Sequence, residues 1–238
     1  MLGVIGGSGF YTLKGRIRES AVSTPYGNVI VEKAGIDGKE AVFIARHGKD
    51  HGLPPHKVNY RANVHAFKAL GVDAVLGIYA TGVISAYKPG DLILVDDFIG
   101  LWTPATFFDD FKGGIKHVDF SQPYEKELQD TLTVIAKEKG ITLKEGGIIA
   151  TTIGPRFESK AEIRALKMMG ANLVSMTHAY EATLIGELEV PYVAVAVGTN
   201  YACGITKKKL STEEVIGHMA KATGKLQILV DGLVEELY

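Results

Sequence analysis

Stretches of nearly continuous apolar residues alternate with amphipathic segments along most of this 238-residue chain. The runs VDAVLGIYAT and DLILVDDFIGL lack polar alternation, which is typical of strands covered on both faces. The segments EKELQDTLTVIAKEKG and KAEIRALKMMG repeat apolar residues at the helical period and end in glycine. This alternation predicts an α/β fold, with a mixed and largely buried β-sheet layered between helices.

The remaining segments fit the same architecture. Two β-like runs in residues 28–48 flank an Asp37-Gly38 turn, which predicts a hairpin. Ser211, followed three residues later by Glu214, predicts a capping box at the start of a C-terminal helix. We also expect strands at residues 2–7, 146–154, 171–176 and 190–200, and helices at residues 54–71 and 179–188. Without repeats or linkers, residues 1–238 are expected to form a single domain.

Charge and composition exclude several classes of protein. The formal net charge of −1 provides no basic field for nucleic acid or an anionic membrane. The only cysteine, Cys203, excludes an internal disulfide and fits a reducing compartment. The N-terminus lacks the basic region of a signal peptide, and no apolar run approaches the roughly 20 residues that span a bilayer. We therefore expect a cytoplasmic protein with neither nucleic acid nor membrane as a partner.

A glycine-rich loop, VIGGSGF, directly follows the first expected strand. Its glycines allow backbone amides to approach an anion, and Ser8 adds a hydroxyl. A dinucleotide fingerprint would need glycine where Thr12 stands, which argues against a Rossmann-type dehydrogenase. No Gly-Lys-Ser/Thr follows, so the loop is not a P-loop. An anion-binding loop and a plain tight turn both remain open.

The segment ARHGKDHGLPPH places charged and imidazole groups at another expected strand end. The planar fork of Arg46 suits phosphate, and His47 adds another hydrogen-bond donor. A solvated polar loop is the alternative, but open α/β sheets bind ligands at the carboxyl ends of their strands. Because His51 and His56 lack a matching cysteine or carboxylate frame, a zinc site is less favoured and no metal is expected.

Two further strand ends carry polar residues. Met176 and Thr177 follow one strand, where a core methionine and a helix cap are the simpler interpretation. Asn200 ends another, although asparagine is also a common turn former. The turn in IGPRFESKAEIR adds residues 156–158. Four polar strand ends together, counting Arg46, favour one shared pocket.

These motifs together resemble a known family. The segments VIGGSGFY, RHGKDHGLPPHKVNYRANVHAFKALGV, KPGDLILVDDFI, GPRFESKAEIR, VSMTHAYEATLIGEL and TNYACG are similar to those of the trimeric nucleoside phosphorylases. That family includes purine nucleoside phosphorylase and methylthioadenosine phosphorylase. The resemblance runs from residue 3 to the final helix in the family's order, with one residue fewer in YATGVISAYKPG.

The resemblance implies phosphate-dependent cleavage of a purine nucleoside through an oxocarbenium-like transition state, with phosphate as a co-substrate and no cofactor. Met176 would lie under the ribose and Phe157 would stack on the base, while Arg156 would pair with a nearby acid. His117, in an irregular segment at residues 102–121, would reach a neighbouring subunit's ribose, which implies a homotrimer or a hexamer. The resemblance implies phosphate binding by Ser8, Arg46, His47, Ala80, Thr81 and Thr177.

Base choice follows from the inventory of hydrogen-bonding groups. An ionised Glu158 only accepts, so it suits the ring N–H of a 6-oxopurine and opposes the lone pair of a 6-aminopurine. Asn200 can donate to the 6-oxo group and accept from a proton arriving at ring nitrogen 7. We therefore expect Glu158 and Asn200 to bind the base and to act in catalysis on inosine, guanosine or 5′-methylthioinosine.

Two alternatives remain at the level of sequence. Methylthioadenosine phosphorylases of the resembled family usually carry aspartates where Asn200 and Ala202 stand here, and Thr212 falls near the expected 5′ end of the sugar. A 5′-methylthioadenosine phosphorylase in methionine salvage is thus the alternative to a purine-salvage enzyme. A catalytically silent nucleoside-binding protein is disfavoured by Arg46, His47 and Thr177 together.

Overall fold

The computed structural model describes residues 1–36 and 38–238. Its helices are α1 (Tyr60–Ala69), α2 (Lys126–Glu138), α3 (Lys160–Met168), α4 (His178–Glu187) and α5 (Thr212–Leu237), with a 3₁₀ turn at Pro55–Lys57. Its strands are β1 (Leu2–Gly6), β2 (Arg16–Thr24), β3 (Gly27–Ile36), β4 (Lys39–Ala45), β5 (Ala74–Val83), β6 (Leu92–Ile99), β7 (Leu143–Thr151), β8 (Leu173–Ser175) and β9 (Tyr192–Tyr201).

Within the described residues these strands form one mixed sheet in the order β2-β3-β4-β1-β5-β8-β7-β6-β9. Strand β5 also pairs in parallel with β9, so the five strands from β5 to β9 close into a ring. Parallel pairs such as β1–β5 and antiparallel pairs such as β6–β9 occur in the same sheet. The predicted α/β fold with a mixed sheet is confirmed, and the closure is an addition to it.

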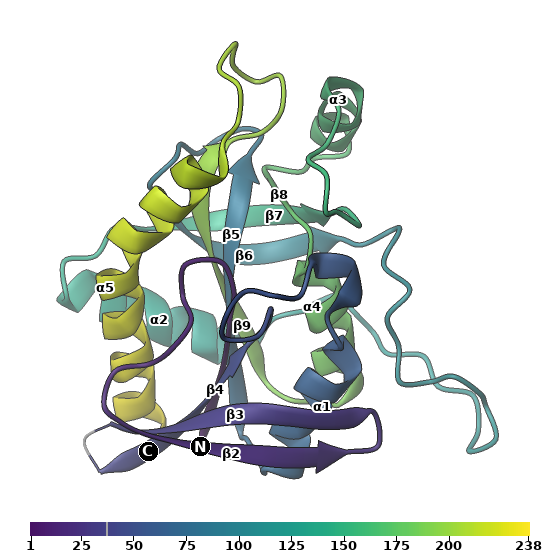
Figure 1. Cartoon of the computed structure of the whole chain (residues 1–238), viewed down its shortest axis with the longest axis vertical. Helices are drawn as coiled ribbons and strands as arrows, with labels where there is room; N and C mark the ends of the chain where they lie inside the picture. Colours follow the sequence, from purple (N-terminus) through teal and green to yellow (C-terminus); the bar gives the residue numbers. More distant parts are fainter. Residues whose placement is uncertain (37) are drawn as a thin grey trace.

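Helices cover the sheet on two sides (Figure 1). Helix α5 packs on β1, β4 and β9, and α2 packs on α5, β7 and β9, so that apolar side chains of both helices share one buried core. Helices α1 and α4 pack against each other beside a second core. None of the helices in the described part of the chain has the length and apolar character needed to cross a membrane.

Two predicted elements differ in the structure, and one strand was not predicted. The helix expected at residues 54–71 is divided, because Val58 is extended and the Asn59 side chain accepts from the Ala62 amide to begin α1. Strand β7 starts at Leu143 rather than at residue 146. Strand β2 was not predicted, since almost all its side chains are exposed and show no alternation. The expected hairpin is present as antiparallel β3 and β4, although Asp37 itself lies outside the described residues.

The complete capping box lies at α3 and not at α5. Ser159 accepts from the Glu162 amide, and the Glu162 carboxylate accepts from the Ser159 amide. Glu162 also accepts two hydrogen bonds from Arg156, at 2.7 and 2.8 Å, so the acid expected to pair with this arginine is identified. At α5, Ser211 accepts from the Glu214 amide, but the Glu214 carboxylate pairs with Lys208.

Residues 102–121 form the irregular segment that the sequence predicts, and it extends away from the body of the molecule (Figure 1). The first residues of the segment are fixed to α4, because Glu187 accepts hydrogen bonds from the Thr106 hydroxyl and the Phe107 amide. Arg61 of α1 holds Asp109 through two hydrogen bonds of 2.6 and 2.7 Å. The structure thus anchors the start of this segment and leaves residues 109–117 exposed, while Phe120 near its end packs against Phe98.

Candidate active site

A cavity of about 490 Å³ opens where several strands end. It brings together the residues that follow β1, β4, β7 and β8 and those that end β5 and β9, which confirms the expectation of one shared pocket. Of the residues predicted to act in the site, all but one line this cavity: Ser8, Arg46, His47, Ala80, Thr81, Phe157, Glu158, Met176, Thr177 and Asn200. Their individual roles remain predictions.

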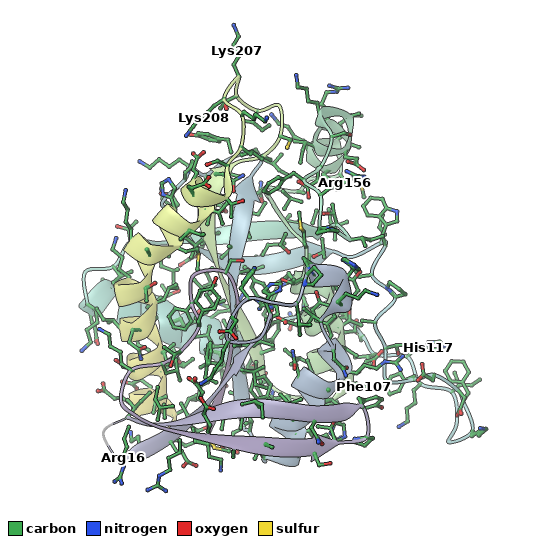
Figure 2. All side chains as sticks on the ribbon, viewed as in Figure 1. Arg16, Phe107, His117, Arg156, Lys207 and Lys208 are labelled. Atoms are coloured by element: carbon green, nitrogen blue, oxygen red, sulfur yellow. The ribbon has the colours of Figure 1, made fainter. Side chains whose placement is uncertain are left out.

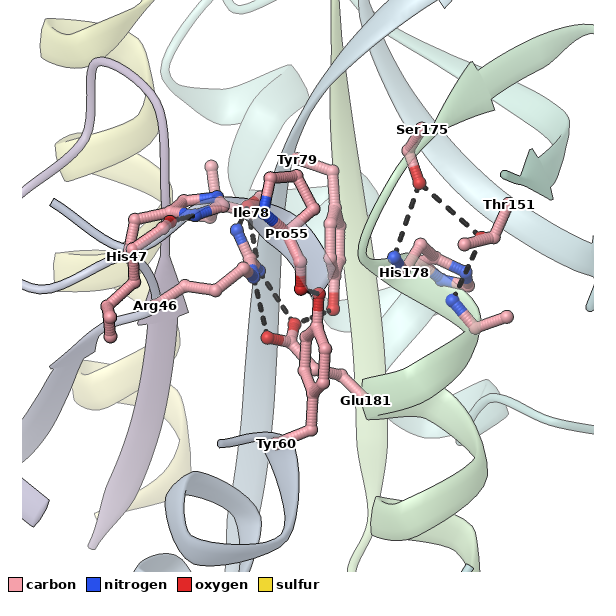
Figure 3. A network of polar contacts seen from close by, with 12 residues as sticks. Arg46, His47, Pro55, Tyr60, Ile78, Tyr79, Thr151, Ser175, His178 and Glu181 are labelled. Carbon is pink, nitrogen blue, oxygen red and sulfur yellow. Dashed lines mark hydrogen bonds and ion pairs between the residues drawn. The ribbon is translucent and has the colours of Figure 1, made fainter. Parts of the chain in front are cut away.

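Thr177 stands at the N-cap position of α4, yet its hydroxyl makes no capping hydrogen bond. Two neighbours cap the helix instead: the Ser175 hydroxyl accepts from the His178 amide, and the Thr151 hydroxyl accepts from the Ala179 amide (Figure 3). The simpler interpretation of Thr177 as a helix cap is therefore wrong. Its hydroxyl is left available at the cavity, next to the positive end of the helix dipole.

The sequence predicted that Arg46 offers its guanidinium fork to phosphate in the cavity. In the structure Glu181 already occupies that fork. The Arg46 Nε and Nη2 atoms donate to the two carboxylate oxygens of Glu181 at 2.6 and 2.7 Å, and both terminal nitrogens lie 3.3 Å from the Ile78 carbonyl (Figure 3). Arg46 and Glu181 are almost fully buried. Burial alone lowers the pKa of Arg46, but the charge and hydrogen bonds of Glu181 outweigh it and raise that pKa.

The ion pair belongs to a wider buried network. The Tyr79 hydroxyl donates to Glu181 at 2.6 Å, and the Tyr192 hydroxyl lies 2.7 Å from that of Tyr79. The Arg46 guanidinium also sits over the Tyr79 ring, 4.5 Å from its centre. Glu181 was missed at the level of sequence, although an acid among the mostly apolar residues of the predicted helix AYEATLIGEL is a signal that could have found it.

His47 is oriented by a backbone group. Its Nδ1 lies 2.7 Å from the Leu53 carbonyl oxygen, which can only accept, so the proton of the neutral ring is on Nδ1. Burial, followed by the charge of Arg46, lowers the pKa of His47 to about 4. The sequence predicted a second donor here, and in the neutral ring the remaining atom, Nε2, carries a lone pair and accepts.

Glu158 and Phe157 also line the cavity. Glu158 is buried and accepts a 2.7 Å hydrogen bond from the Thr152 hydroxyl through Oε1. Burial raises the pKa of Glu158, and the Thr152 hydrogen bond opposes that rise. Phe157 is 43% exposed, so its ring is free to cover a flat ligand. Arg156 points away to Glu162 and does not line the cavity.

A β-bulge positions Asn200. The pairing of β5 with β9 shifts by one residue between Thr81 and Gly82, which leaves Thr199 as an extra residue. The Thr199 hydroxyl donates to Asn200 Oδ1 at 2.8 Å, and Asn200 Nδ2 donates to the Tyr201 carbonyl at 3.0 Å. One N–H and one acceptor position of the amide remain for a ligand. Thr81 itself donates its hydroxyl proton to the Val197 carbonyl within the sheet.

The predicted residue outside the cavity is His117. It lies on the extended segment (Figure 2) and does not line the cavity of its own chain, and its ring contacts Phe111 edge to face with centroids 6.0 Å apart. Two cavity residues, Thr212 and Val215, come from the start of α5; only Thr212 was singled out in the sequence. Among the described residues, no three His, Cys, Asp or Glu side chains lie close enough together to hold a metal ion.

Comparison with known proteins gives one consistent family. Residues 1–235 match the family model described as the phosphorylase superfamily. A probable 6-oxopurine nucleoside phosphorylase of Thermococcus kodakarensis is 43% identical, with 98% of this chain and 91% of that protein covered. The 6-oxopurine nucleoside phosphorylase of Pyrococcus furiosus is 40% identical, over 96% and 90%. A probable S-methyl-5′-thioinosine phosphorylase of Methanopyrus kandleri is 41% identical, over 98% and 91%.

Solved structures give the same fold. Methylthioadenosine phosphorylase from Schistosoma mansoni in complex with adenine superposes with a TM-score of 0.91. It is 27% identical, and the match covers 99% of this chain and 91% of that one. The similarity therefore extends over the whole cavity and every strand end that lines it.

Proposed function

Because this chain belongs to the phosphorylase superfamily, we propose that it is a purine nucleoside phosphorylase that cleaves 6-oxopurine nucleosides with inorganic phosphate. Inosine, guanosine and 5′-methylthioinosine are the candidate substrates. The bond between C1′ of the sugar and the purine breaks, and a bond from C1′ to a phosphate oxygen forms. Hydrogenphosphate brings one proton and the departing purine needs one, so the products are a neutral base and a sugar 1-phosphate dianion.

The observation that carries the proposal is that Glu158 and Asn200 line the same cavity. Since Thr152 uses one carboxylate oxygen of Glu158, the other is left to accept from the ring N–H of a 6-oxopurine. The free N–H of Asn200 can donate to the 6-oxo group, and its free acceptor position can accept a hydrogen bond from the N–H formed at ring nitrogen 7. A 6-aminopurine would place a lone pair against the carboxylate, which hydrogen-bonding sites reject strongly.

The groups proposed to hold phosphate line the same cavity. Ser8, Thr177 and the amides around the glycine loop and the start of α4 supply neutral donors. Arg46 and His47 border the same place. Among the described residues that line the cavity, Arg46 is the only lysine or arginine. No metal or organic cofactor is part of the proposal.

At the 5′ end of the sugar the structure supports a tolerant site. Thr212 and Val215 offer a small hydroxyl and an apolar surface side by side at the cavity wall. A 5′-hydroxyl and a 5′-methylthio group both suit such a surface. The similarity to methylthioadenosine phosphorylases keeps methylthioadenosine cleavage as the second candidate, with the same phosphate chemistry and a different base.

We further propose a homotrimer, or a hexamer of two trimers, acting in purine salvage in the cytoplasm. Support comes from His117, which does not line the cavity of its own chain and is presented outward near the exposed side chains of Phe111 and Ile115. In this arrangement His117 completes a neighbouring subunit's ribose site.

The proposed reaction is tested by measuring hypoxanthine release from inosine with and without phosphate, and with and without a chelator. We expect release that requires phosphate and is unaffected by the chelator. Release that persists in phosphate-free buffer would indicate hydrolysis, and loss of activity with the chelator would indicate a metal that the proposal does not include.

A further inference from the structure

The charge of Glu158 is buried, and one hydroxyl group stabilises it. Glu158 is 7% exposed, and the Thr152 hydroxyl donates to its Oε1 atom at 2.7 Å. Among the described residues no side-chain cation pairs with this carboxylate, because the nearby Arg156 forms its ion pair with Glu162. A buried carboxylate without a cation depends on the hydrogen bonds that it accepts. The Thr152 hydroxyl is therefore the side-chain group that most favours the ionised form of Glu158.

Thr152 does not line the cavity itself, so it can act on a ligand only through Glu158. It directly follows β7, and its backbone amide donates to the carbonyl of Ser175, the last residue of β8, at 2.9 Å. The Thr152 hydroxyl lies 3.5 Å from the same carbonyl oxygen, which is too long for a strong hydrogen bond, so Glu158 is its principal acceptor. The ends of two strands thus fix the position of the hydroxyl beside the carboxylate.

We infer that Thr152 is a positioning residue that sets base choice by holding Glu158 in its ionised, hydrogen-bond-accepting state. An ionised Glu158 accepts from the ring N–H of a 6-oxopurine and opposes the lone pair of a 6-aminopurine. A protonated Glu158 carries an O–H that can donate to that lone pair, and it is a weaker acceptor for the ring N–H. Loss of the Thr152 hydroxyl should therefore shift the site towards 6-aminopurines. The inference rests on the proposed function only in taking Glu158 as the group that contacts ring nitrogen 1.

Proton uptake makes this choice depend on pH. Burial raises the pKa of Glu158, and the Thr152 hydrogen bond opposes that rise. The other titratable groups that face Glu158 are Glu162, which adds to the rise, and Arg156, which opposes it. Cys203 lies after β9, and burial together with the charge of Glu158 raises the pKa of its thiol, which keeps it neutral. A 6-aminopurine should bind together with one proton, so its affinity should fall about tenfold per pH unit above the pKa of Glu158.

The test uses the purified wild-type protein, with hypoxanthine and adenine as ligands. Titration calorimetry at pH 6, 7 and 8 gives the affinity for each base. We expect hypoxanthine to bind at least about 100-fold more tightly than adenine at pH 8, with a smaller ratio at pH 6 because adenine gains affinity as pH falls. Equal affinities at pH 8, or an adenine affinity independent of pH, would overturn the inference.

The variant Thr152→Val removes the hydroxyl and keeps the shape of the side chain. Loss of a hydrogen bond to a charged group favours the protonated form of Glu158 by roughly tenfold or more. We therefore expect the hypoxanthine-to-adenine affinity ratio at pH 7 to fall by at least about tenfold. The matched control Thr152→Ser keeps a hydroxyl and should retain most of the wild-type ratio. An unchanged ratio in Thr152→Val would refute the assignment to Thr152.

A double variant separates the charge of Glu158 from packing around it. Because glutamine does not titrate, adding Thr152→Val to Glu158→Gln should change neither the affinity ratio nor its pH dependence. A further tenfold fall in that background would show that Thr152 acts through packing, and the inference would fail. If Thr152→Val does not fold, Thr152→Cys replaces it with the same expected direction, since a thiol is a weak donor.

The two proposals can fail separately. Hypoxanthine-selective binding that depends on the Thr152 hydroxyl, without nucleoside cleavage, would leave the inference standing and refute the proposed function. Phosphate-dependent cleavage of inosine by a protein whose base choice is the same in Thr152→Val would do the reverse.

Discussion

Asn200 is held by hydrogen bonds on both sides of its amide, so its remaining donor and acceptor have fixed directions. We expect Asn200→Asp to weaken cleavage of inosine by roughly 5- to 150-fold, because an ionised aspartate cannot donate to the 6-oxo group and one lost donor costs about 1–3 kcal/mol. The aspartate can accept from a 6-amino group, so adenosine cleavage should increase. Steady-state kinetics with both nucleosides measure the change, and equal losses for both would show that Asn200 does not read the base.

Glu158 provides the complementary test at the other position of the base. Glu158→Gln keeps the shape and the Thr152 contact but removes the charge-assisted hydrogen bond to the ring N–H. We expect a loss of kcat/KM for inosine similar to that of Asn200→Asp. Any gain in kcat/KM for adenosine should come only from the N–H donor that the glutamine amide adds. Unchanged inosine kinetics would place the base elsewhere.

Two buried histidines should make stability depend on pH. Burial, followed by the charge of Arg46, lowers the pKa of His47 to about 4 and that of His178 to about 3, both from 6.5. Between these values and 6.5 the unfolded chain binds more protons than the folded one, so stability rises with pH there and is lost as pH falls from 6.5 towards 4. Each histidine contributes a slope of up to about 1.4 kcal/mol per pH unit.

Urea unfolding at pH 4.5, 5.5 and 6.5 measures this slope, and His178→Gln isolates one contribution. The glutamine variant can still bond the Tyr124 hydroxyl, which lies 2.9 Å from His178 Nε2, but it does not titrate. We expect a smaller pH slope in the variant. The same slope in both proteins would mean that His178 is protonated in the folded state.

How far the site could be predicted differs from residue to residue. Arg46, Thr177 and Asn200 were found because they are polar residues at the ends of apolar strands, where an α/β fold gathers its ligands. The use of each group could not be predicted, because it depends on distant partners. Glu181 lies 135 positions from Arg46 and decides what the guanidinium can bind, and the Leu53 carbonyl decides which nitrogen of the His47 ring is protonated.

At the scale of elements, the turn after β1 is shaped around Arg46. Gly7→Ala would place a methyl group 2.4 Å from Arg46 Nη1, and Glu181 and Ile78 prevent the guanidinium from moving aside. We expect a rise of at least about tenfold in KM for phosphate and a smaller change in KM for nucleoside. Gly217→Ala, at an open position in α5, is the matched control. Equal rises in both KM values would indicate general damage to the fold.

Whether a helix or strand could be predicted depends on whether its own residues carry a recognisable pattern. Strands β5, β6 and β9 were predicted because covered strands have unbroken apolar runs. Strand β2 could not be predicted. It is an edge strand that pairs with β3 alone among the described strands, and its exposed side chains show no alternation of apolar and polar residues. The break before α1 depends on the extended backbone of Val58. The helical spacing of apolar residues continues through this position, so the sequence pattern does not show the break.

At the scale of the whole molecule, the closure of five strands into a ring rests on pairing β5 with β9, more than 100 residues apart, which no local pattern encodes. No local sequence pattern encodes the assembly either. We predict that His117→Ala raises KM for nucleoside more than KM for phosphate, because the side chain is proposed to reach a neighbour's ribose. Light scattering that gives a fully active monomer would contradict this.

Mixed assemblies test the same point without relying on KM alone. Co-expression of His117→Ala with Glu158→Gln should recover activity in sites that combine an intact cavity from one subunit with an intact His117 from another. If the mixture is no more active than the average of the two variants, His117 does not complete a neighbour's site.

The most direct test of the central claim is a comparison of kcat/KM for inosine, 5′-methylthioinosine, adenosine and 5′-methylthioadenosine at saturating phosphate. The arrangement of Glu158 and Asn200 predicts higher values for the two 6-oxopurine nucleosides than for their 6-amino counterparts. A value for 5′-methylthioadenosine above those of both inosine and 5′-methylthioinosine would contradict the account.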